Sequence, residues 1–265
     1  MSTCLGKVSG VLLDLSGTLH VDNTPTPSAV SALNRLRDVC VPFRFITNTT
    51  KESKRILYAR LRGIGFDISE DEIFTSLTAA RRLIEADKLH PLLLLEDSAR
   101  EDFEGVVDGC TQQQQHDCVV VGLAPSRFGY THLNQAFRLL LGGSRLIAIH
   151  RAKYYKKEDG IAIGPGPYVA ALEYASGCTA QVVGKPEPSF FNSVLKEIDC
   201  PISEAVMIGD DILNDIKGAQ DMGMKGILVK TGKYRDGDEK TVHSPPRLVC
   251  DNFAEAVEII ISNNK

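Results

Sequence analysis

The sequence lacks the features of disulfide-stabilised, zinc-binding and membrane-spanning proteins. Its seven cysteines are an odd number and no two have CxxC spacing, which argues against a disulfide framework or a zinc cluster and favours a reducing compartment. The longest apolar runs, such as residues 91–95 and 118–123, are far shorter than the roughly 20 residues that a bilayer span needs. A lysine and then a strand-like run with Asp14 inside it make a poor signal peptide.

The sequence also has no large excess of positive or negative charge. The net charge of -4 provides neither a basic footprint for nucleic acid nor an acidic tail. We therefore expect a cytoplasmic protein that has neither nucleic acid nor a membrane as a partner. The 265 residues, 43% of them hydrophobic and 24% charged, are typical of an ordinary globular protein with one large domain or two modest ones.

Short apolar runs alternate with amphipathic stretches along the chain. The predicted strands are residues 8–15, 41–47, 92–95, 118–122, 146–150, 180–183, 205–208 and 227–230. The predicted helices are residues 28–39, 53–62, 78–89, 101–107, 130–141, 167–176, 189–198, 212–222 and 253–262, and Ser69 and Glu72 predict a capping box for a further short helix. This alternation indicates an α/β fold with a doubly wound parallel sheet. The pattern leaves open whether residues 80–180 extend that sheet or form a second α/β module.

Four segments carry residue types that can take part in a chemical reaction. The first is Asp14-Leu15-Ser16-Gly17-Thr18, at the end of the first predicted strand. In open α/β sheets, ligands bind outside the carboxyl ends of the strands. An ionised carboxylate in an apolar run is costly without a cation or donors, and beside a metal it can act as a nucleophile on phosphorus. The alternative is an aspartate that only caps the end of the strand or opens a turn.

The second and third segments also follow predicted strands. Thr47 and Asn48 offer a hydroxyl and an amide that can hold phosphate oxygens, although both residue types are common in turns. Lys185 can neutralise a nucleophile and a phosphate, or can be a solvated loop lysine. Its Gly-Lys-Pro sequence does not fit a Walker A loop, because Pro186 stands where Ser or Thr is required.

The fourth segment places three acids, Asp210, Asp211 and Asp215, directly after a predicted strand. Hard oxygen ligands of this kind suit Mg²⁺, with Asp210 as a ligand and Asp215 placed to orient the waters around the ion. The alternative is a helix N-terminus that carries acids for dipole reasons.

These four segments, in this order, resemble the signature of the haloacid dehalogenase superfamily. The length between Thr47 and Lys185, and the Gly-Pro-Gly-Pro stretch at 164–167, are similar to the branch with a large α/β cap. The resemblance implies a Rossmann-like parallel-sheet core at residues 1–77 and 181–265 with an inserted α/β cap at residues 78–180. It also implies that the protein is a homodimer.

The resemblance implies a role for each matching residue. Asp14 becomes a phosphoaspartate, and Lys185 counters charge. Asp14, the Ser16 carbonyl and Asp210 bind Mg²⁺, and Asp215 supports this metal site. Thr47 and Asn48 hold the phosphoryl oxygens. The implied function is Mg²⁺-dependent hydrolysis of a small phosphorylated molecule, pyrophosphate or a phosphoamide.

Ser16 departs from the pattern of the superfamily. Its phosphatases usually carry a second aspartate there, which protonates the leaving group and later activates water. A serine hydroxyl has no suitable pKa for this work, and such a role is worth about 10²–10⁴-fold in rate. We therefore expect slow turnover, and least loss with good leaving groups. Two alternatives stay open: a phosphoryl-binding or regulatory module that has lost turnover, and a phosphomutase-like phosphotransferase.

Residues 150–157 are basic and aromatic. They can steer an anionic substrate, or they can form the solvated face of a turn or hairpin.

Overall fold

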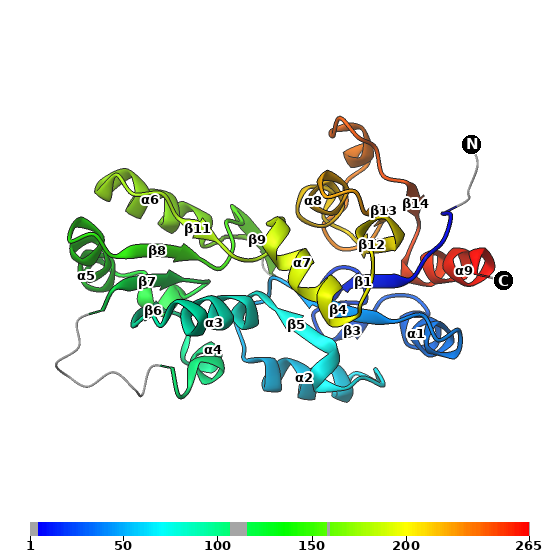
Figure 1. Cartoon of the computed structure of the whole chain (residues 1–265), viewed down its shortest axis with the longest axis horizontal. Coiled ribbons are helices and arrows are strands. Elements are labelled where there is room, and N and C mark those ends of the chain that lie inside the picture. The colour runs from blue at the N-terminus through cyan, green and yellow to red at the C-terminus, as the bar shows by residue number, and fades with distance from the viewer. Residues whose placement is uncertain (1–4, 107–115, 158–159, 265) are drawn as a thin grey trace. The chain divides into compact units, whose positions relative to one another are not determined.

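The computed structural model describes residues 5–106, 116–157 and 160–264 (Figure 1). These residues form two compact units. The first holds the described residues up to Thr47, Leu57–Phe74 and the chain from Lys185 onward, and the second holds Asn48–Ile56 and Thr75–Gly184. The cap predicted from the sequence spans residues 78–180. The longer segment of the second unit, Thr75–Gly184, begins three residues earlier and ends four residues later.

A six-stranded sheet forms the centre of the first unit. Its order is β14 (Leu248–Cys250), β13 (Lys225–Val229), β12 (Ala205–Gly209), β1 (Gly10–Asp14), β4 (Phe43–Thr47) and β5 (Ile73–Thr75). The pairs β1–β12, β1–β4, β12–β13 and β13–β14 are parallel. Strands β1 and β12 are buried along their whole length, as expected for a parallel sheet that is covered on both faces.

Helices and short turns complete this unit. They are α1 (Ala29–Asp38), α2 (Lys54–Gly63, which begins in the second unit), η1 (Glu70–Glu72), α7 (Pro188–Glu197), η4 (Ile202–Glu204), η5 (Ile212–Lys217), α8 (Gly218–Asp221), η6 (Asp238–Lys240) and α9 (Phe253–Asn263), with a hairpin of β2 (His20–Val21) and β3 (Thr24–Pro25). Helix α1 packs against α9. Leu33 and Leu36 of α1 join Val257 and Ile260 of α9 in the main core of this unit.

The second unit has its own four-stranded parallel sheet, so the region at 80–180 does not extend the first one. The order is β11 (Gln181–Val182), β8 (Arg145–Ala148), β7 (Cys118–Val121) and β6 (Pro91–Leu94). The remaining elements are α3 (Ser76–Asp87), α4 (Asp97–Arg100), η2 (Glu101–Phe103), η3 (Pro125–Arg127), α5 (Tyr130–Leu141), α6 (Gly166–Ser176) and an antiparallel hairpin of β9 (Tyr154–Lys157) and β10 (Gly160–Ile163).

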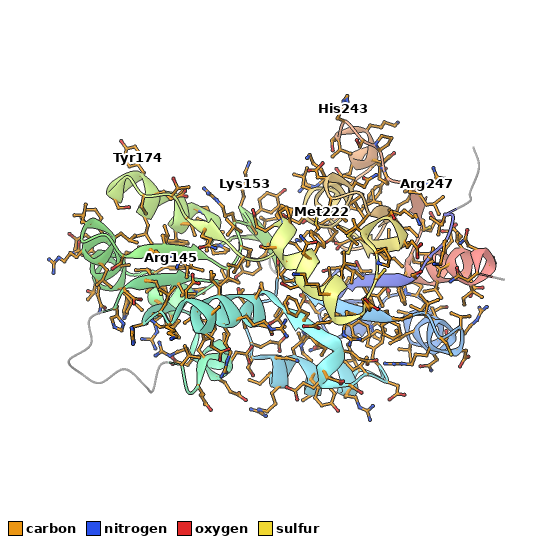
Figure 2. All side chains as sticks on the ribbon, in the orientation of Figure 1. Arg145, Lys153, Tyr174, Met222, His243 and Arg247 are labelled. Carbon is orange, nitrogen blue, oxygen red and sulfur yellow. The ribbon has the colours of Figure 1, made fainter. Side chains whose placement is uncertain are left out.

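Helices cover both faces of this second sheet (Figure 1). Val120 of β7 joins a cluster with Ile84 of α3, whereas its neighbour Val121 joins a cluster with Leu140 of α5 and Leu172 of α6. This alternation follows from the period of two along a strand. Figure 2 shows Tyr174 of α6 directed away from the unit, and this side chain is 93% exposed.

Some predicted elements differ from the structure. The helix predicted at 212–222 is a π-helical turn, η5, followed by the short α8, because the main-chain oxygen of Asp211 accepts hydrogen bonds from the N–H groups of both Asp215 and Ile216. Strands β5 and β14 were not predicted, since three residues are too few for a period to show.

The stretch at 150–157, one of whose predicted alternatives was a hairpin, contributes β9 to one. Cys4 and Cys110 lie outside the described residues, and the five described cysteines are free thiols. No helix in the described ranges combines the length and apolarity that a bilayer crossing requires.

Candidate active site

The carboxyl ends of the central strands bring together residues from distant parts of the first unit. Asp14 is the last residue of β1 and Thr47 is the last residue of β4. Asp210 directly follows β12. Because β1 pairs in parallel with both neighbours, these three side chains come to the same edge of the sheet.

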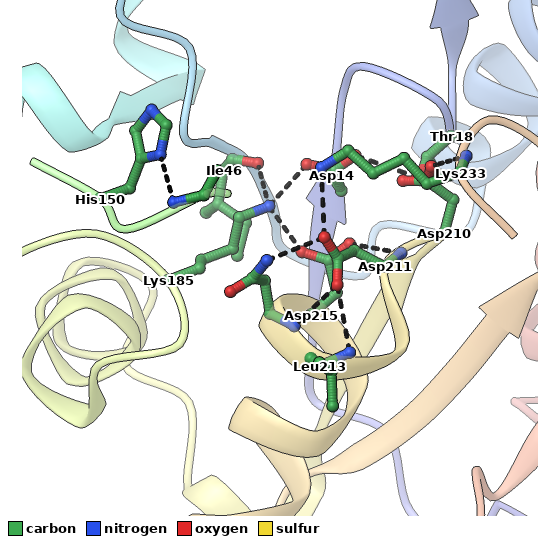
Figure 3. A network of polar contacts seen from close by, with 12 residues as sticks. Asp14, Thr18, Ile46, His150, Lys185, Asp210, Asp211, Leu213, Asp215 and Lys233 are labelled. Carbon is green, nitrogen blue, oxygen red and sulfur yellow. Dashed lines mark hydrogen bonds and ion pairs between the residues drawn. The ribbon is translucent and has the colours of Figure 1, made fainter. Parts of the chain in front are cut away.

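Lys185 lies between two of the predicted carboxylates (Figure 3). Its ammonium nitrogen lies 2.5 Å from Asp14 Oδ1 and 2.7 Å from Asp215 Oδ1. It also donates a hydrogen bond of 3.3 Å to the main-chain oxygen of Ile46. The lysine and both acids are buried, so the ammonium and its two partners form an ion-paired cluster out of solvent.

Thr18 lies between the other pair of carboxylates. Its hydroxyl is 3.2 Å from Asp14 Oδ2 and 3.4 Å from Asp210 Oδ1. A hydroxyl carries one hydrogen and can donate it to only one of these oxygens at a time. The two carboxylates are therefore close together with one proton donor shared between them, which leaves lone pairs available to a cation.

Two glycines allow the main chain to approach Asp210. Gly17 has φ +98°, and a Cβ atom there would lie 2.1 Å from Asp210 Oδ2. Gly232 has φ +54°, and its Cβ would lie 2.2 Å from the same oxygen. The amide N–H of Lys233 donates a hydrogen bond of 2.6 Å to this oxygen. The loop at 231–233 thus fixes one oxygen of Asp210 at close range.

Burial and like charge set the pKa values of the acids. Burial, together with the neighbouring Asp14 and Asp215, raises the pKa of Asp210 well above its ordinary value. Burial also raises the pKa of Asp215, to about 7, even though Lys185 opposes the shift. Burial lowers the pKa of Lys185, but the charges of Asp14 and Asp215 outweigh burial and raise it above its usual range.

Asp211 has the opposite electrostatic setting. Burial raises its pKa, but Lys233 and hydrogen bonds from Asn214 outweigh burial and lower it. The ammonium of Lys233 lies 3.1 Å from Asp211 Oδ2, and burial and this acid act on the pKa of Lys233 in opposite directions, with a net increase. Asp211 and Lys233 therefore neutralise one another, and the other three carboxylates keep their surplus of negative charge.

The cluster fits a divalent metal ion. Asp14, Asp210 and Asp215 each offer a carboxylate oxygen, and these three oxygens lie within 4.8 Å of one another. The ammonium of Lys185 contacts two of these three buried carboxylates, those of Asp14 and Asp215. The cluster therefore has an excess of negative charge, which a divalent cation would neutralise. A set made only of oxygen ligands is the type that Mg²⁺ prefers.

The structure places the other predicted residues as follows. Thr47 is buried at the end of β4, one position beyond Ile46, which is in register with Asp14. Ser16 has an exposed side chain and forms an isolated bridge with His20. Asn48 belongs to the second unit. The roles of these residues remain predictions.

Sequence reasoning missed the contributions of Thr18, Gly232 and Lys233. Thr18 lay inside the first quoted segment, four residues after Asp14, where its hydroxyl offered a weak signal. Gly232 and Lys233 follow β13, and no acid marks that strand end. A rule that weighs every strand end of the sheet equally would have included them.

Comparison with known sequences identifies the family. A model described as haloacid dehalogenase-like hydrolase matches residues 11–106, and a second, HAD-hydrolase-like, matches residues 182–256. The chain is therefore a member of the haloacid dehalogenase-like hydrolases, and the class of enzyme supported by these matches and by the similar solved structures is a phosphatase.

Individual relatives cover nearly the whole chain. The chain is 57% identical to haloacid dehalogenase-like hydrolase domain-containing protein 2 of Rattus norvegicus over 97% of both sequences, and 56% identical to the Homo sapiens protein over 99% of both. It is 38% identical to the Homo sapiens phospholysine phosphohistidine inorganic pyrophosphate phosphatase, over 98% of this chain and 96% of the relative.

Solved structures share the fold. A 4-nitrophenylphosphatase from Thermotoga maritima aligns with a TM-score of 0.88 at 25% identity, over 96% of this chain and 98% of that one. A glycerol phosphate phosphatase from Mycobacterium tuberculosis, solved in complex with magnesium, aligns with a TM-score of 0.82 at 25% identity, over 94% of this chain and 76% of that one.

Proposed function

We propose that the protein is a Mg²⁺-dependent phosphatase that uses Asp14 as its nucleophile. The observation that carries the proposal is the buried cluster of Asp14, Asp210 and Asp215 at the carboxyl ends of parallel strands, in which Lys185 pairs with Asp14 and Asp215. The magnesium complex of the structurally similar glycerol phosphate phosphatase supports the choice of ion. Asp14, Asp210 and the Ser16 carbonyl would hold Mg²⁺, which would supply positive charge to the phosphoryl group.

The residues of the chain have distinct tasks in this reaction. A carboxylate oxygen of Asp14 forms a bond to phosphorus, and the bond from phosphorus to the leaving group breaks with its electron pair. Lys185 stabilises the charge on Asp14 and on the phosphoryl oxygens, and Thr47 and Asn48 hold these oxygens. Water then attacks the phosphorus of the aspartyl-phosphate, which releases phosphate and restores Asp14.

The side chain at position 16 determines for which substrates the rate of hydrolysis is reduced least. A serine there cannot donate a proton to a poor leaving group at neutral pH. Aryl phosphates, pyrophosphate and phosphoamides have leaving groups that depend less on this proton. The names of two similar proteins agree with this preference, since one is a 4-nitrophenylphosphatase and another is a phospholysine phosphohistidine inorganic pyrophosphate phosphatase.

Release of 4-nitrophenol from 4-nitrophenyl phosphate by the purified protein tests the proposal. We expect turnover with Mg²⁺, none after chelation, and none in Asp14→Asn. Asp71→Asn, at an exposed acid of η1, is the matched control and should keep full activity.

Two other outcomes would favour the alternative functions. If wild type and Asp14→Asn are equally inactive on aryl phosphates, pyrophosphate and phosphoamides, the protein is a phosphoryl-binding or regulatory module that has lost turnover, as Ser16 would favour. If phosphate moves to an added alcohol or sugar in preference to water, the protein is a phosphotransferase.

A further inference from the structure

Asp211 has a bonding pattern that the proposed function does not use. Its Oδ1 accepts hydrogen bonds from the main-chain N–H groups of Leu213, at 3.1 Å, and Asn214, at 3.0 Å. Its Oδ2 accepts one from Asn214 Nδ2 at 2.8 Å and lies 3.1 Å from the ammonium of Lys233. A carboxylate has about four lone-pair positions, so four donors fill its capacity.

The main chain of Asp211 acts on the neighbouring acid. Its N–H donates a hydrogen bond of 3.1 Å to Asp215 Oδ2, and its oxygen accepts one of 3.0 Å from the N–H of Asp215. The other oxygen of Asp215 lies 2.7 Å from Lys185. Asp215 is thus held by Asp211 at its backbone and at one carboxylate oxygen, and by Lys185 at the other.

These two observations describe one turn (Figure 3). The side chain of Asp211 caps η5 and pairs with Lys233, and this fixes the direction in which the N–H of Asp211 points. The same Lys233 donates its main-chain N–H to Asp210, so both strand-end loops are joined through Asp211 and Lys233.

We propose that Asp211 is a positioning residue of the metal site. Its carboxylate is occupied by four donors and does not bind the cation, and its main chain holds Asp215 in place beside the metal site. This inference rests on the proposed function. It divides the three acids of the segment into a ligand, Asp210, a residue that supports the site, Asp215, and a residue that positions the supporter, Asp211.

Charge-matched double variants separate positioning from direct ligation. Asp211→Asn with Lys233→Met keeps a capping oxygen and removes one charge of each sign, so the net charge is unchanged. Asp211→Ala with Lys233→Met has the same net charge but no capping oxygen. If the Ala variant does not fold, Asp211→Gly with Lys233→Met also lacks the oxygen and is better tolerated at a helix N-cap.

Calorimetric titration with Mg²⁺ alone, in the absence of substrate, gives the readout. We expect the Asn variant to bind within about threefold of wild type and the Ala variant to bind at least about tenfold more weakly, the range typical of lost support around a metal ligand. Equal, severe loss in both variants would make Asp211 a ligand. Unchanged Mg²⁺ affinity in an Ala variant with a lower unfolding temperature would reduce Asp211 to a structural cap.

The titration also distinguishes failure of this inference from failure of the proposed function on which it rests. If wild type does not bind Mg²⁺, both the proposed function and this inference fail. If wild type binds Mg²⁺ and hydrolyses 4-nitrophenyl phosphate while the Ala variant binds equally well, only the inference fails.

Discussion

The ammonium nitrogen of Lys185 lies 2.5 Å from Oδ1 of Asp14, although the two residues are 171 positions apart in the sequence. Only 3% of the lysine side chain and 8% of the aspartate side chain are exposed. A buried ion pair of this kind contributes little net stability as a whole, but removal of one partner leaves an uncompensated buried charge.

Lys185→Met should therefore destabilise the protein and abolish most of its activity. We expect a loss of about 3–5 kcal/mol in the free energy of unfolding without metal, the usual cost of breaking a buried pair. Hydrolysis of 4-nitrophenyl phosphate should fall by at least about 100-fold, since a preorganised positive group is lost. Urea unfolding and a steady-state assay provide the two measurements.

Lys217→Met is the matched control for this change. Lys217 is half-exposed and pairs with Asp221 four residues later, and such pairs contribute no more than about 0.5 kcal/mol. Similar losses in the two variants would show that burial does not set the importance of Lys185.

The sequence allowed the buried charge cluster to be predicted because chemistry and position coincide there. Asp14, Lys185 and Asp210 each follow an apolar run, and the rule that parallel strand ends gather at one edge brings them together. Thr18 and the loop at 231–233 could not be ranked in this way. Thr18 contributes through the position of its hydroxyl, 3.2 and 3.4 Å from two carboxylate oxygens, and the residue type alone does not reveal this position. The loop contributes a main-chain N–H, which every residue except proline has.

The α/β class was likewise predictable from alternation, but the π-helical turn at 212–217 was not. Residues 212–222 have a helical pattern whether the main chain bonds at i+4 or i+5. The choice is made by the turn of Asp211, whose oxygen accepts from both Asp215 and Ile216. Local main-chain hydrogen bonds to one residue thus decide a detail that a periodic pattern does not resolve.

Gly17→Ala tests how closely the first loop must approach Asp210. The new Cβ would lie 2.1 Å from Asp210 Oδ2, at a backbone φ of +98° that side chains rarely adopt. We expect loss of Mg²⁺ binding in a calorimetric titration as well as loss of hydrolysis. Gly237→Ala is the control, because Gly237 has φ +93° with no atom within 4 Å of the new Cβ.

The comparison isolates steric displacement from backbone strain. The control should lower the free energy of unfolding by about 1–2 kcal/mol, the cost of a left-handed residue, and should leave Mg²⁺ affinity unchanged. Retained Mg²⁺ affinity in Gly17→Ala would contradict the assignment of Asp210 as a ligand.

The stability of the metal-free protein should fall as pH rises from about 4 to about 7. The pKa of Asp215 is about 7 in the folded protein, and that of Asp210 is also raised, whereas an unfolded aspartate has a pKa of about 3.9. Between these values the folded state binds more protons than the unfolded state, so each increase in pH favours unfolding. Urea unfolding at pH 5 and pH 8 measures the slope.

Saturating Mg²⁺ should remove most of this slope, because the ion replaces the protons on the carboxylates. The gain in unfolding temperature on adding Mg²⁺ should accordingly be larger at pH 8 than at pH 5. Asp215→Asn should flatten the metal-free profile. A metal-free stability that rises over the same interval would contradict the raised pKa values.

A second pH effect, of opposite sign, should come from Glu72. Arg37 donates to both oxygens of Glu72 at 2.6 Å; burial raises the pKa of this acid, but Arg37 and the N–H of Ser69 lower it overall. The stabilising contribution is thus present at neutral pH and is lost as pH falls below the unfolded value of about 4.3.

Glu72→Gln should therefore cost about 1 kcal/mol at pH 7, typical of a partly buried, bidentate pair, and much less at pH 3. Asp67→Asn is the comparison, since its ion pair with Arg62 is more exposed and should contribute less than about 0.5 kcal/mol. Equal losses from Glu72→Gln at the two pH values would exclude the carboxylate charge as the cause.

Ser16→Asp should raise turnover on phosphate esters with poor leaving groups. The side chain of Ser16 is exposed two positions after Asp14, and an aspartate there would supply the proton that serine cannot. We expect kcat on an alkyl phosphate to rise by about 10-fold or more, within the range of general acid–base catalysis, and kcat on 4-nitrophenyl phosphate to change less.

Ser16→Asn is the control, because it has the shape of aspartate without a titratable proton. Only in the aspartate variant should kcat on the alkyl phosphate fall as pH rises through the pKa of an acid in the enzyme–substrate complex. If both variants gain equally, shape and not proton transfer limits wild type. If neither gains, a step other than leaving-group protonation limits the reaction, and the selectivity ascribed to Ser16 is wrong.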